Sequence, residues 1–466
     1  MAQARTVATP VAVRVQVVAP AHLGETAVAA LRARGLEARL GESHEGTDDL
    51  VALALETLPN SANAVELAAV CARAAEHGRP MCILAPPPRG TGTAAIQRAA
   101  ALAYLRAHGA VLGHDVDAWL EAVVALVRFG LPHGPRVAVI APTGSWLEAQ
   151  TLALVTEAEA ANTRAPQLAS EYKAKAEPTD VVLFDPELTP APATLPGNAL
   201  AMHVVGRGEL AHGEPALYSM RNALGAIDML GRAAERIAVG VGPATDASGL
   251  EIDRAVLDQR FAKITGPRVG DHDTKGLLRA YGVAITRQVV ADTPSKAVQK
   301  AREVGYPVEM KPFGPDVPTE REGCHVERDI TSDARVRSAF SSVLAGIYKG
   351  AIIREAPPLG RDVAAHIVRL SSLGWTVVLE VNGQVVAAPA PLRPLDANAL
   401  AGALLASRAG EADLDRAGLA TLLRGASHLA ADLGDRLVRL ELPRIVVGGR
   451  GARTVVVDAW CELASR

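Results

Sequence analysis

Aromatic residues and cysteines are scarce in this sequence, and both shortages exclude classes of protein. Phe, Trp and Tyr make up 3% of the 466 residues, which nearly excludes an aromatic platform on which nucleic-acid bases stack. The four cysteines (Cys71, Cys82, Cys324 and Cys461) form no CxxC or Cys/His metal spacing, which argues against a structural zinc site. Scattered apolar cysteines are typical of the reducing cytoplasm, the compartment that we expect.

Neither sign of charge is in clear excess, and long hydrophobic runs are missing. The chain has 48 Lys and Arg against 51 Asp and Glu, so we expect no nucleic-acid partner. No stretch reaches the ~18 uninterrupted apolar residues of a membrane span, and we expect no membrane segment and no secretory leader. Because 49% of the residues are hydrophobic, the chain can bury large aliphatic cores, in about three domains by length.

Several common catalytic motifs are also absent. The sequence contains no GxxxxGK[ST] phosphate loop, no HExxH zinc motif and no GxSxG nucleophile motif. Gly240–Thr245 only half resembles a dinucleotide-binding loop, because the third glycine is missing. The function must therefore be sought in other patterns.

The first half of the chain alternates short aliphatic runs with Ala/Leu/Arg-rich segments. Val13–Ala19 is typical of a buried strand, and the pattern restarts at Arg136–Ala141 after a Pro/Gly-rich break. Such alternation predicts βαβ units and parallel sheets covered on both faces. We therefore predict two α/β units, at residues 11–133 and 134–240, after a flexible N-terminus at residues 1–10.

The pattern changes after a predicted linker at residues 241–268. Short runs such as Thr376–Val381 and Gln384–Ala388 are typical of strands, and the Asn382-Gly383 pair between them is typical of a hairpin turn. Hairpins of this kind indicate an antiparallel or mixed sheet. We predict an α+β domain over residues 269–466.

One segment of this last domain carries a specific pattern. Lys275–Val283 reads KGLLRAYGV, and Gly305–Lys311 reads GYPVEMK. The two together resemble the opening lobe of the ATP-grasp domain in the NDP-forming acyl-CoA synthetases, relatives of succinyl-CoA synthetase, in which K-x-L-L-x-x-Y-G-I precedes G-Y-P-V-V-L-K. The resemblance implies that Lys311 points at the phosphates of a bound nucleotide. The alternative is an exposed lysine at the end of a strand.

The resemblance continues toward the C-terminus. Ile352–Glu355 is similar to the family strand that enters the adenine hinge, which implies that Glu355 lies near the nucleotide. The hairpin from Arg439 to Ala459 resembles the pattern E-x-N-P … D-A, in which Asn and the later Asp bind Mg²⁺. Asp458 is thus implied as a metal ligand, with Glu441 as a second candidate. Each of the three acids could instead be an ordinary polar residue of a strand.

Some family features are missing from the sequence. Leu442 stands before Pro443 where the family has the Mg²⁺-binding Asn, and a leucine offers no oxygen to a hard cation. The first half resembles the family's ligase subdomains, but Gly90–Ala95 contains no histidine where the family carries the one that relays phosphate. The CoA-binding Rossmann domain that usually leads such chains is also not found.

The predicted fold is therefore α/β, with two flavodoxin-like parallel-sheet ligase subdomains followed by an α+β ATP-grasp-like domain. The leading interpretation is a divergent acyl-CoA synthetase-like protein with impaired or lost ligase activity that binds a nucleotide or CoA or acts as a scaffold. A second is an active ATP-dependent acid–CoA ligase whose phosphohistidine and CoA-binding domain come from a partner chain. A third is an ATP-grasp enzyme that makes an acyl phosphate directly. The resemblance implies ATP and Mg²⁺ as ligands, with CoA as a further candidate.

Overall fold

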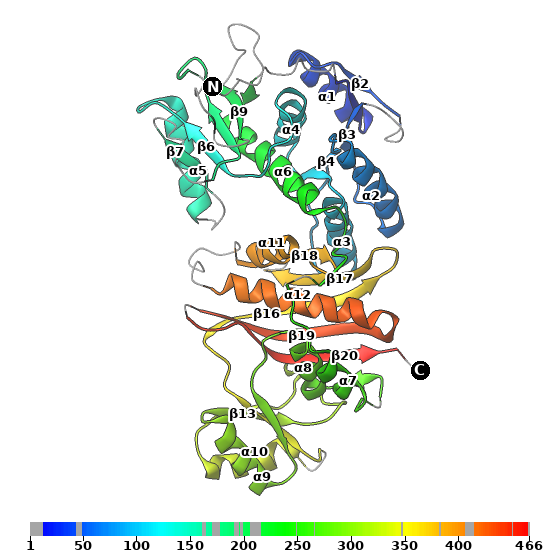
Figure 1. Ribbon diagram of the computed structural model, residues 1–466, viewed down its shortest axis with the longest axis vertical. Coiled ribbons are helices and arrows are strands. Elements are labelled where there is room, and N and C mark those ends of the chain that lie inside the picture. Colours follow the sequence, from blue (N-terminus) through cyan, green and yellow to red (C-terminus); the bar gives the residue numbers. More distant parts are fainter. Residues whose placement is uncertain are drawn as a thin grey trace. The chain divides into compact units, whose positions relative to one another are not determined.

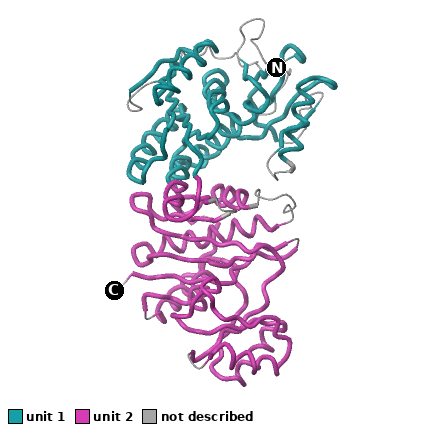
Figure 2. The backbone as a smooth tube through the Cα atoms, turned by 180° about the vertical axis from the view of Figure 1, so that it is seen from behind, with its two compact units in different colours: residues 1–88, 101–242 teal, residues 89–100, 243–466 magenta. Residues whose placement is uncertain are grey.

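The computed structural model describes two compact units. The first comprises residues 1–88 and 101–242, and the second residues 89–100 and 243–466 (Figure 2). The predicted flexible segment 1–10 and the predicted Asn382-Gly383 turn lie outside the described residues, and the predicted domain boundaries stay predictions. The structure describes residues 13–42, 49–160, 165–169, 178–190, 195, 199–205, 216–247, 249–264, 266–345, 348–381, 384–405, 414–449 and 451–464.

Two five-stranded parallel sheets form the first unit (Figure 1). One has the order β2-β1-β3-β4-β5, with strands Ala38–Leu40, Val15–Val18, Leu50–Ala54, Cys82–Leu84 and Val111–Gly113. The other has the order β10-β9-β8-β6-β7, with strands Leu217–Tyr218, Leu200–Val205, Val181–Phe184, Val137–Ile140 and Gln167–Ala169. The order of the first sheet is the doubly wound, flavodoxin-like one, so the predicted parallel α/β class is confirmed.

Aliphatic packing holds these sheets and their helices together. A single cluster of buried aliphatic side chains combines strands of both sheets with α4 and α6. Helix α4 begins after Asp115, whose carboxylate accepts the N–H of Ala118 at 2.8 Å and so caps the helix. The helices are α1 (Ala21–Ala33), α2 (Ser61–Glu76), α3 (Thr93–Ala107), α4 (Val116–Arg128), α5 (Trp146–Ala160) and α6 (Met220–Val239).

The second unit contains two antiparallel sheets, which confirms the predicted change of architecture. The six-stranded sheet has the order β11-β20-β19-β16-β17-β18, with strands Arg268–Val269, Val455–Leu463, Leu437–Gly448, Gly360–Leu370, Gly374–Val381 and Gln384–Pro389. The four-stranded sheet has the order β12-β15-β13-β14, with strands Gln288–Ala291, Ala351–Glu355, Val308–Pro312 and Glu327–Ile330.

Helices cover one face of each antiparallel sheet. Apolar residues of α9 and α10 pack on the four-stranded sheet, and those of α8, α11 and α12 pack on the six-stranded sheet. On the opposite faces, the six-stranded sheet carries further apolar residues such as Val446 and Val457, and the four-stranded sheet carries charged residues such as Glu309 and Lys311. The helices are α7 (Arg254–Phe261), α8 (Asp271–Arg279), α9 (Pro294–Val304), α10 (Asp333–Leu344), α11 (Pro394–Leu405) and α12 (Arg416–Leu433), with 3₁₀ turns η1 (Glu320–Glu322) and η2 (Gly434–Arg436). Within the described residues, no helix combines the length and the apolar character needed to span a membrane.

Candidate functional site

Lys311 and Asp458, the two residues that the resemblance assigns to phosphate and metal binding, contact each other. Lys311 is on β13 and Asp458 on β20, and the Lys311 Nζ donates to Asp458 Oδ1 at 2.7 Å. Alternate residues of a strand point to opposite faces, so Val308 and Met310 enter the core under α9 and α10, whereas Glu309 and Lys311 point the other way. Lys311 and Asp458 are 2% and 1% exposed, so this is a buried ion pair.

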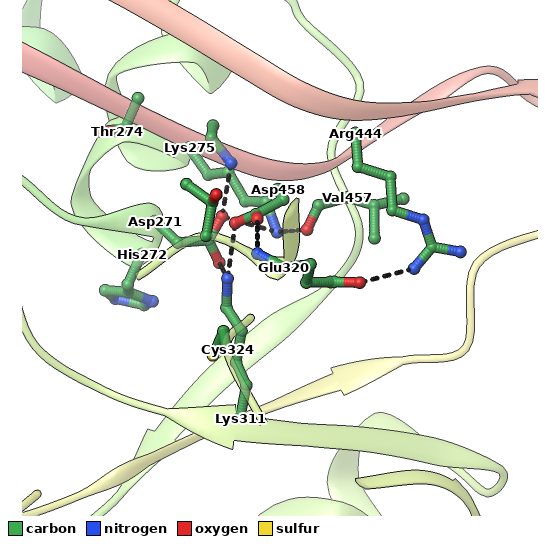
Figure 3. Close-up of polar contacts among 12 residues, drawn as sticks. Asp271, His272, Thr274, Lys275, Lys311, Glu320, Cys324, Arg444, Val457 and Asp458 are labelled. Carbon is green, nitrogen blue, oxygen red and sulfur yellow. Dashed lines mark hydrogen bonds and ion pairs between the residues drawn. The ribbon is translucent and has the colours of Figure 1, made fainter. Parts of the chain in front are cut away.

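A second carboxylate completes the neutralisation of Lys311. Asp271, the first residue of α8, places Oδ2 at 3.2 Å from the Lys311 Nζ and Oδ1 at 3.2 Å from the Nζ of Lys275, one helical turn later. The N–H of Ala459 also donates to Asp271 Oδ1 at 2.9 Å. Two lysines and two aspartates thus form one buried cluster (Figure 3), which we call the Lys/Asp cluster.

The Lys275 ammonium has all its donor positions filled. Its Nζ donates to the Val457 carbonyl at 2.6 Å, to Gln288 Oε1 at 2.9 Å and to Thr286 Oγ1 at 3.1 Å. Burial lowers the pKa of Lys275 to about 8, against the opposing influence of Asp271. The side chain is fully buried, so Lys275 anchors the cluster and offers no donor to a ligand.

Electrostatic attraction opposes the effect of burial on the pKa of Asp271 and of Lys311. Burial alone would raise the pKa of Asp271, but Lys275 and Lys311 lower it to about 2. Burial would lower the pKa of Lys311, but the neighbouring carboxylates of Asp271 and Asp458 raise it. The Lys311 ammonium is therefore a charged group that is already satisfied from within the protein.

The turn η1 closes over this cluster. The backbone N–H of Glu320 donates to Asp458 Oδ2 at 2.9 Å, so both oxygens of Asp458 have donors. The carboxylate of Glu320 pairs with Arg354, with Arg444 at 3.1 Å and with Arg328 at 2.8 Å. Burial would raise the pKa of Glu320, but Arg354 and Arg444 lower it to about 2.

Arg354 joins the turn to both sheets. It lies on β15 and is fully buried, and its Nε and Nη2 hold Glu309 Oε2 at 2.9 and 2.5 Å. Its Nη1 donates to the Val457 carbonyl at 2.7 Å. Glu309 stands where the family strand G-Y-P-V-V-L-K carries a second valine, so a charged pair occupies a position that the family pattern makes apolar.

Little free space remains beside the cluster. The pocket lined by Asp271, Lys311, Thr319, Asp458 and Trp460 holds about 10 Å³, roughly the room of one water molecule. A nucleotide phosphate cannot reach Lys311 in this arrangement without displacing residues that line this pocket, such as Pro318 and Thr319.

The other two predicted site residues have partners elsewhere. Glu355, at the end of β15, accepts the N–H of Arg287 at 2.8 Å and pairs with Arg453. Glu441, on β19, accepts from His366 on the neighbouring strand β16. The structure therefore brings Lys311 and Asp458 together and leaves the roles of Glu355 and Glu441 as predictions.

The donor set does not fit a Mg²⁺ ion in this conformation. Asp458 is engaged by Lys311 and by the Glu320 N–H, and Leu442 is fully buried in the hydrophobic core. Among the described residues, no three His, Cys, Asp or Glu side chains are grouped to hold a metal. Because Mg²⁺ requires several oxygen ligands, these residues do not provide a site for the ion.

Comparisons with known proteins identify the domain that carries the cluster. A family model described as "ATP-grasp domain" matches residues 266–463. The beta subunit of ADP-forming acetate–CoA ligase II of Pyrococcus furiosus is 25% identical over 209 residues, covering 41% of this chain and 89% of the relative. The beta subunit of ligase I of the same organism is 30% identical over 130 residues, 26% of this chain and 56% of the relative.

More distant matches involve longer proteins and solved structures. The ADP-forming 4-hydroxybutyrate–CoA ligase of Nitrosopumilus maritimus is 23% identical over 225 residues, 44% of this chain but only 32% of that ligase. A solved acetyl-coenzyme A synthetase 1 of Ca. Korarchaeum cryptofilum in complex with coenzyme A has a TM-score of 0.40 and 22% identity, covering 45% of this chain and 99% of the other. Residues 266–463 are thus an ATP-grasp domain homologous to the beta subunits of ADP-forming acetate–CoA ligases.

Proposed function

We propose that this ATP-grasp, acid–CoA ligase-like protein does not form acyl-CoA on its own and serves as a nucleotide- or CoA-binding or scaffolding protein of the cytoplasm. The 2.7 Å contact of Lys311 with Asp458 carries the proposal. Lys311, implied for phosphate binding, and Asp458, implied for metal binding, neutralise each other. A third charged residue, Asp271, also pairs with Lys311. An electrophilic clamp on a transferring phosphoryl group needs free positive charge, which this arrangement lacks.

The missing histidine supports the same proposal. A covalent phosphate relay requires a nucleophile, and the segment Gly90–Ala95 contains no histidine. The free cysteines Cys71, Cys82 and Cys461 are buried, and burial raises the pKa of each to about 12. Burial also raises the pKa of the partly exposed Cys324, to about 11. They are therefore poor substitutes as nucleophiles at neutral pH.

A turnover assay tests the proposal. The purified full chain is incubated with ATP, Mg²⁺, CoA and a series of short carboxylic acids, and acyl-CoA is measured by mass spectrometry. We expect no acyl-CoA above the level of a reaction without protein. ATP- and CoA-dependent formation of acyl-CoA by the chain alone would overturn the proposal.

A second function is favoured by the kind of relatives that the chain matches. Two of them are named as beta subunits, so the missing histidine and CoA-binding domain could be provided by another chain. Repeating the assay with partners co-purified from the native host tests this alternative, with acyl-CoA formation only in the mixture as its expected result.

A further inference from the structure

Three guanidinium groups converge on one carboxylate beside the Lys/Asp cluster. Arg354 comes from β15, Arg444 from β19 and Arg328 from β14, and all three contact the carboxylate of Glu320. Figure 3 shows the Glu320 side chain reaching Arg444 while its backbone meets Asp458. We call the three arginines the arginine site.

The charges of the arginine site are not balanced without Glu320. Arg354 keeps Glu309, and Arg444 keeps Asp362 at 3.2 Å, whereas Arg328 has Glu309 only at 3.6 Å. Three guanidinium groups would then face two carboxylates, one of which, Asp362, is 61% exposed. The Glu320 side chain is 9% exposed, so the anion that balances this site is largely withdrawn from water. Guanidinium forks match phosphate oxygens as well as carboxylates.

The segment that delivers Glu320 is small and self-contained. Thr319 and Glu322 form a reciprocal capping box around η1, and Gly323 ends it with φ of +92°. No aliphatic or aromatic side chain between residues 313 and 325 belongs to the buried core of the described chain. The turn is therefore held in place mainly by polar contacts, among them those of Glu320 with Asp458 and Arg354. Segments with few buried apolar contacts are the ones that open at low free-energy cost.

We propose that Glu320 is an internal substitute for a phosphate group, and that displacement of the turn 319–323 opens the arginine site to a polyphosphate. The same movement removes the N–H donor from Asp458 Oδ2, so the anion site and the aspartate become accessible together. The inference rests on the proposed function, because it concerns the same site. It gives the class of ligand and the segment that controls the entry of that ligand. Binding is expected without chemistry, since the phosphate relay stays absent.

Titration calorimetry of the full chain with inorganic tripolyphosphate tests this inference, at low salt and without metal, CoA or acid. The variant Glu320→Gln removes the competing charge, and Glu322→Gln is the matched control. Glu322 lies on the same turn, is half exposed and has its nearest cation, Arg268, at 3.7 Å, and a glutamine at its position preserves the capping box. We expect at least tenfold tighter binding to Glu320→Gln than to the wild type or the control.

Two further variants make the result specific. The double variant Glu320→Gln/Arg444→Met should lose the gain, because one guanidinium is removed. Glu320→Asp keeps the charge but shortens the side chain away from the arginines, so it should also bind more tightly, and it replaces Glu320→Gln if that variant does not fold. ATP and CoA are titrated in parallel. The one that binds more tightly is the molecule whose phosphate groups the arginine site recognises.

The inference is overturned if neither Glu320 variant binds tripolyphosphate more tightly than the wild type, or if Glu322→Gln gains as much as Glu320→Gln. The second outcome would mean that net charge alone controls binding. The proposed function is tested by acyl-CoA formation and this inference by binding in the absence of CoA and acid, so each can fail while the other stands.

Discussion

Both units bury charged residues, but they do so in different ways. In the first unit, a buried acid pairs with an arginine that stays partly in water: Asp180 is 4% exposed and its partner Arg136 is 49% exposed. In the second unit both partners are buried, as with Lys311 and Asp458 at 2% each. A half-solvated pair adds little to stability, whereas a fully buried pair is costly to break because an uncompensated charge remains. The Lys311–Asp458 pair of the second unit should therefore cost more to break than the Arg136–Asp180 pair of the first.

The largest expected effect comes from breaking the buried pair. Lys311→Met removes the cation that pairs with Asp458, whereas Asp271 keeps Lys275. The buried carboxylate left without its partner should cost the second unit about 3–5 kcal/mol of unfolding free energy. Hydrogen exchange in urea, read by mass spectrometry for each unit, measures this loss. Lys296→Met is the control, because Lys296 and its partner Asp292 are 60% and 59% exposed. Equal stability of the two variants would contradict the comparison.

The next largest effect is expected from acid, which should lower the stability of the second unit more than that of the first. The pKa of Glu320 is lowered to about 2 from 4.5, and that of Asp271 to about 2 from 3.8. Both carboxylates stabilise the folded state above about pH 4.5, and this stability is lost as the pH falls from 4.5 toward 2. For Glu320 the loss is about 2–3 kcal/mol.

Urea titrations at pH 5 and pH 3 measure this acid effect. The second unit should lose more stability over this range in the wild type than in Glu320→Gln, because the glutamine does not titrate. An identical pH dependence in both proteins would show that Glu320 is not held by the arginines.

A smaller effect is expected from the half-solvated pair of the first unit. Arg136→Met removes two hydrogen bonds of 2.7 Å to Asp180, but the Arg136 N–H at 3.0 Å remains. We expect a loss of about 1 kcal/mol in the first unit, measured by the same exchange experiment. A loss as large as that of Lys311→Met would remove the distinction between the two kinds of pair.

The smallest effect concerns Glu441, the second metal candidate. Its hydrogen bond raises the pKa of His366, so this pair stabilises the fold below about pH 6.5 and the contribution is lost as the pH rises through the raised pKa. Glu441→Gln should lower the His366 pKa, seen by NMR titration of the imidazole, and cost less than about 1 kcal/mol. A His366 pKa that does not change in the variant would show that the two side chains are not coupled.

Fold class could be read from the sequence because it depends on local patterns. The aliphatic runs of β1 and β6 and the hairpin strands β17 and β18 (Figure 1) are marked by residues near each other in the chain. The helices α11 and α12 were not predicted, because Ala and Gly dilute their apolar periodicity. The local sequence pattern therefore predicts these strands, but it does not predict these two helices.

The site could be read only in part, because its contacts are made between distant segments. Lys311 and Asp458 are 147 residues apart, and the resemblance placed both at a nucleotide but could not show that they neutralise each other. Asp271, Glu320 and Arg354 were missed for the same reason. Glu309, a charge within a strand where the family has valine, was the one local indication of a buried partner.

The carbonyl of Val457 has a mechanical consequence for the second unit. It accepts from Lys275 at 2.6 Å and from Arg354 at 2.7 Å, and Arg354 belongs to the four-stranded sheet whereas Val457 belongs to the six-stranded one. One peptide oxygen thus joins the two sheets through hydrogen bonds. Pulling the sheets apart would break the Arg354–Val457 and Lys275–Gln288 hydrogen bonds together, so the sheets should fluctuate as a single body, and the short turn η1 remains the part that can move.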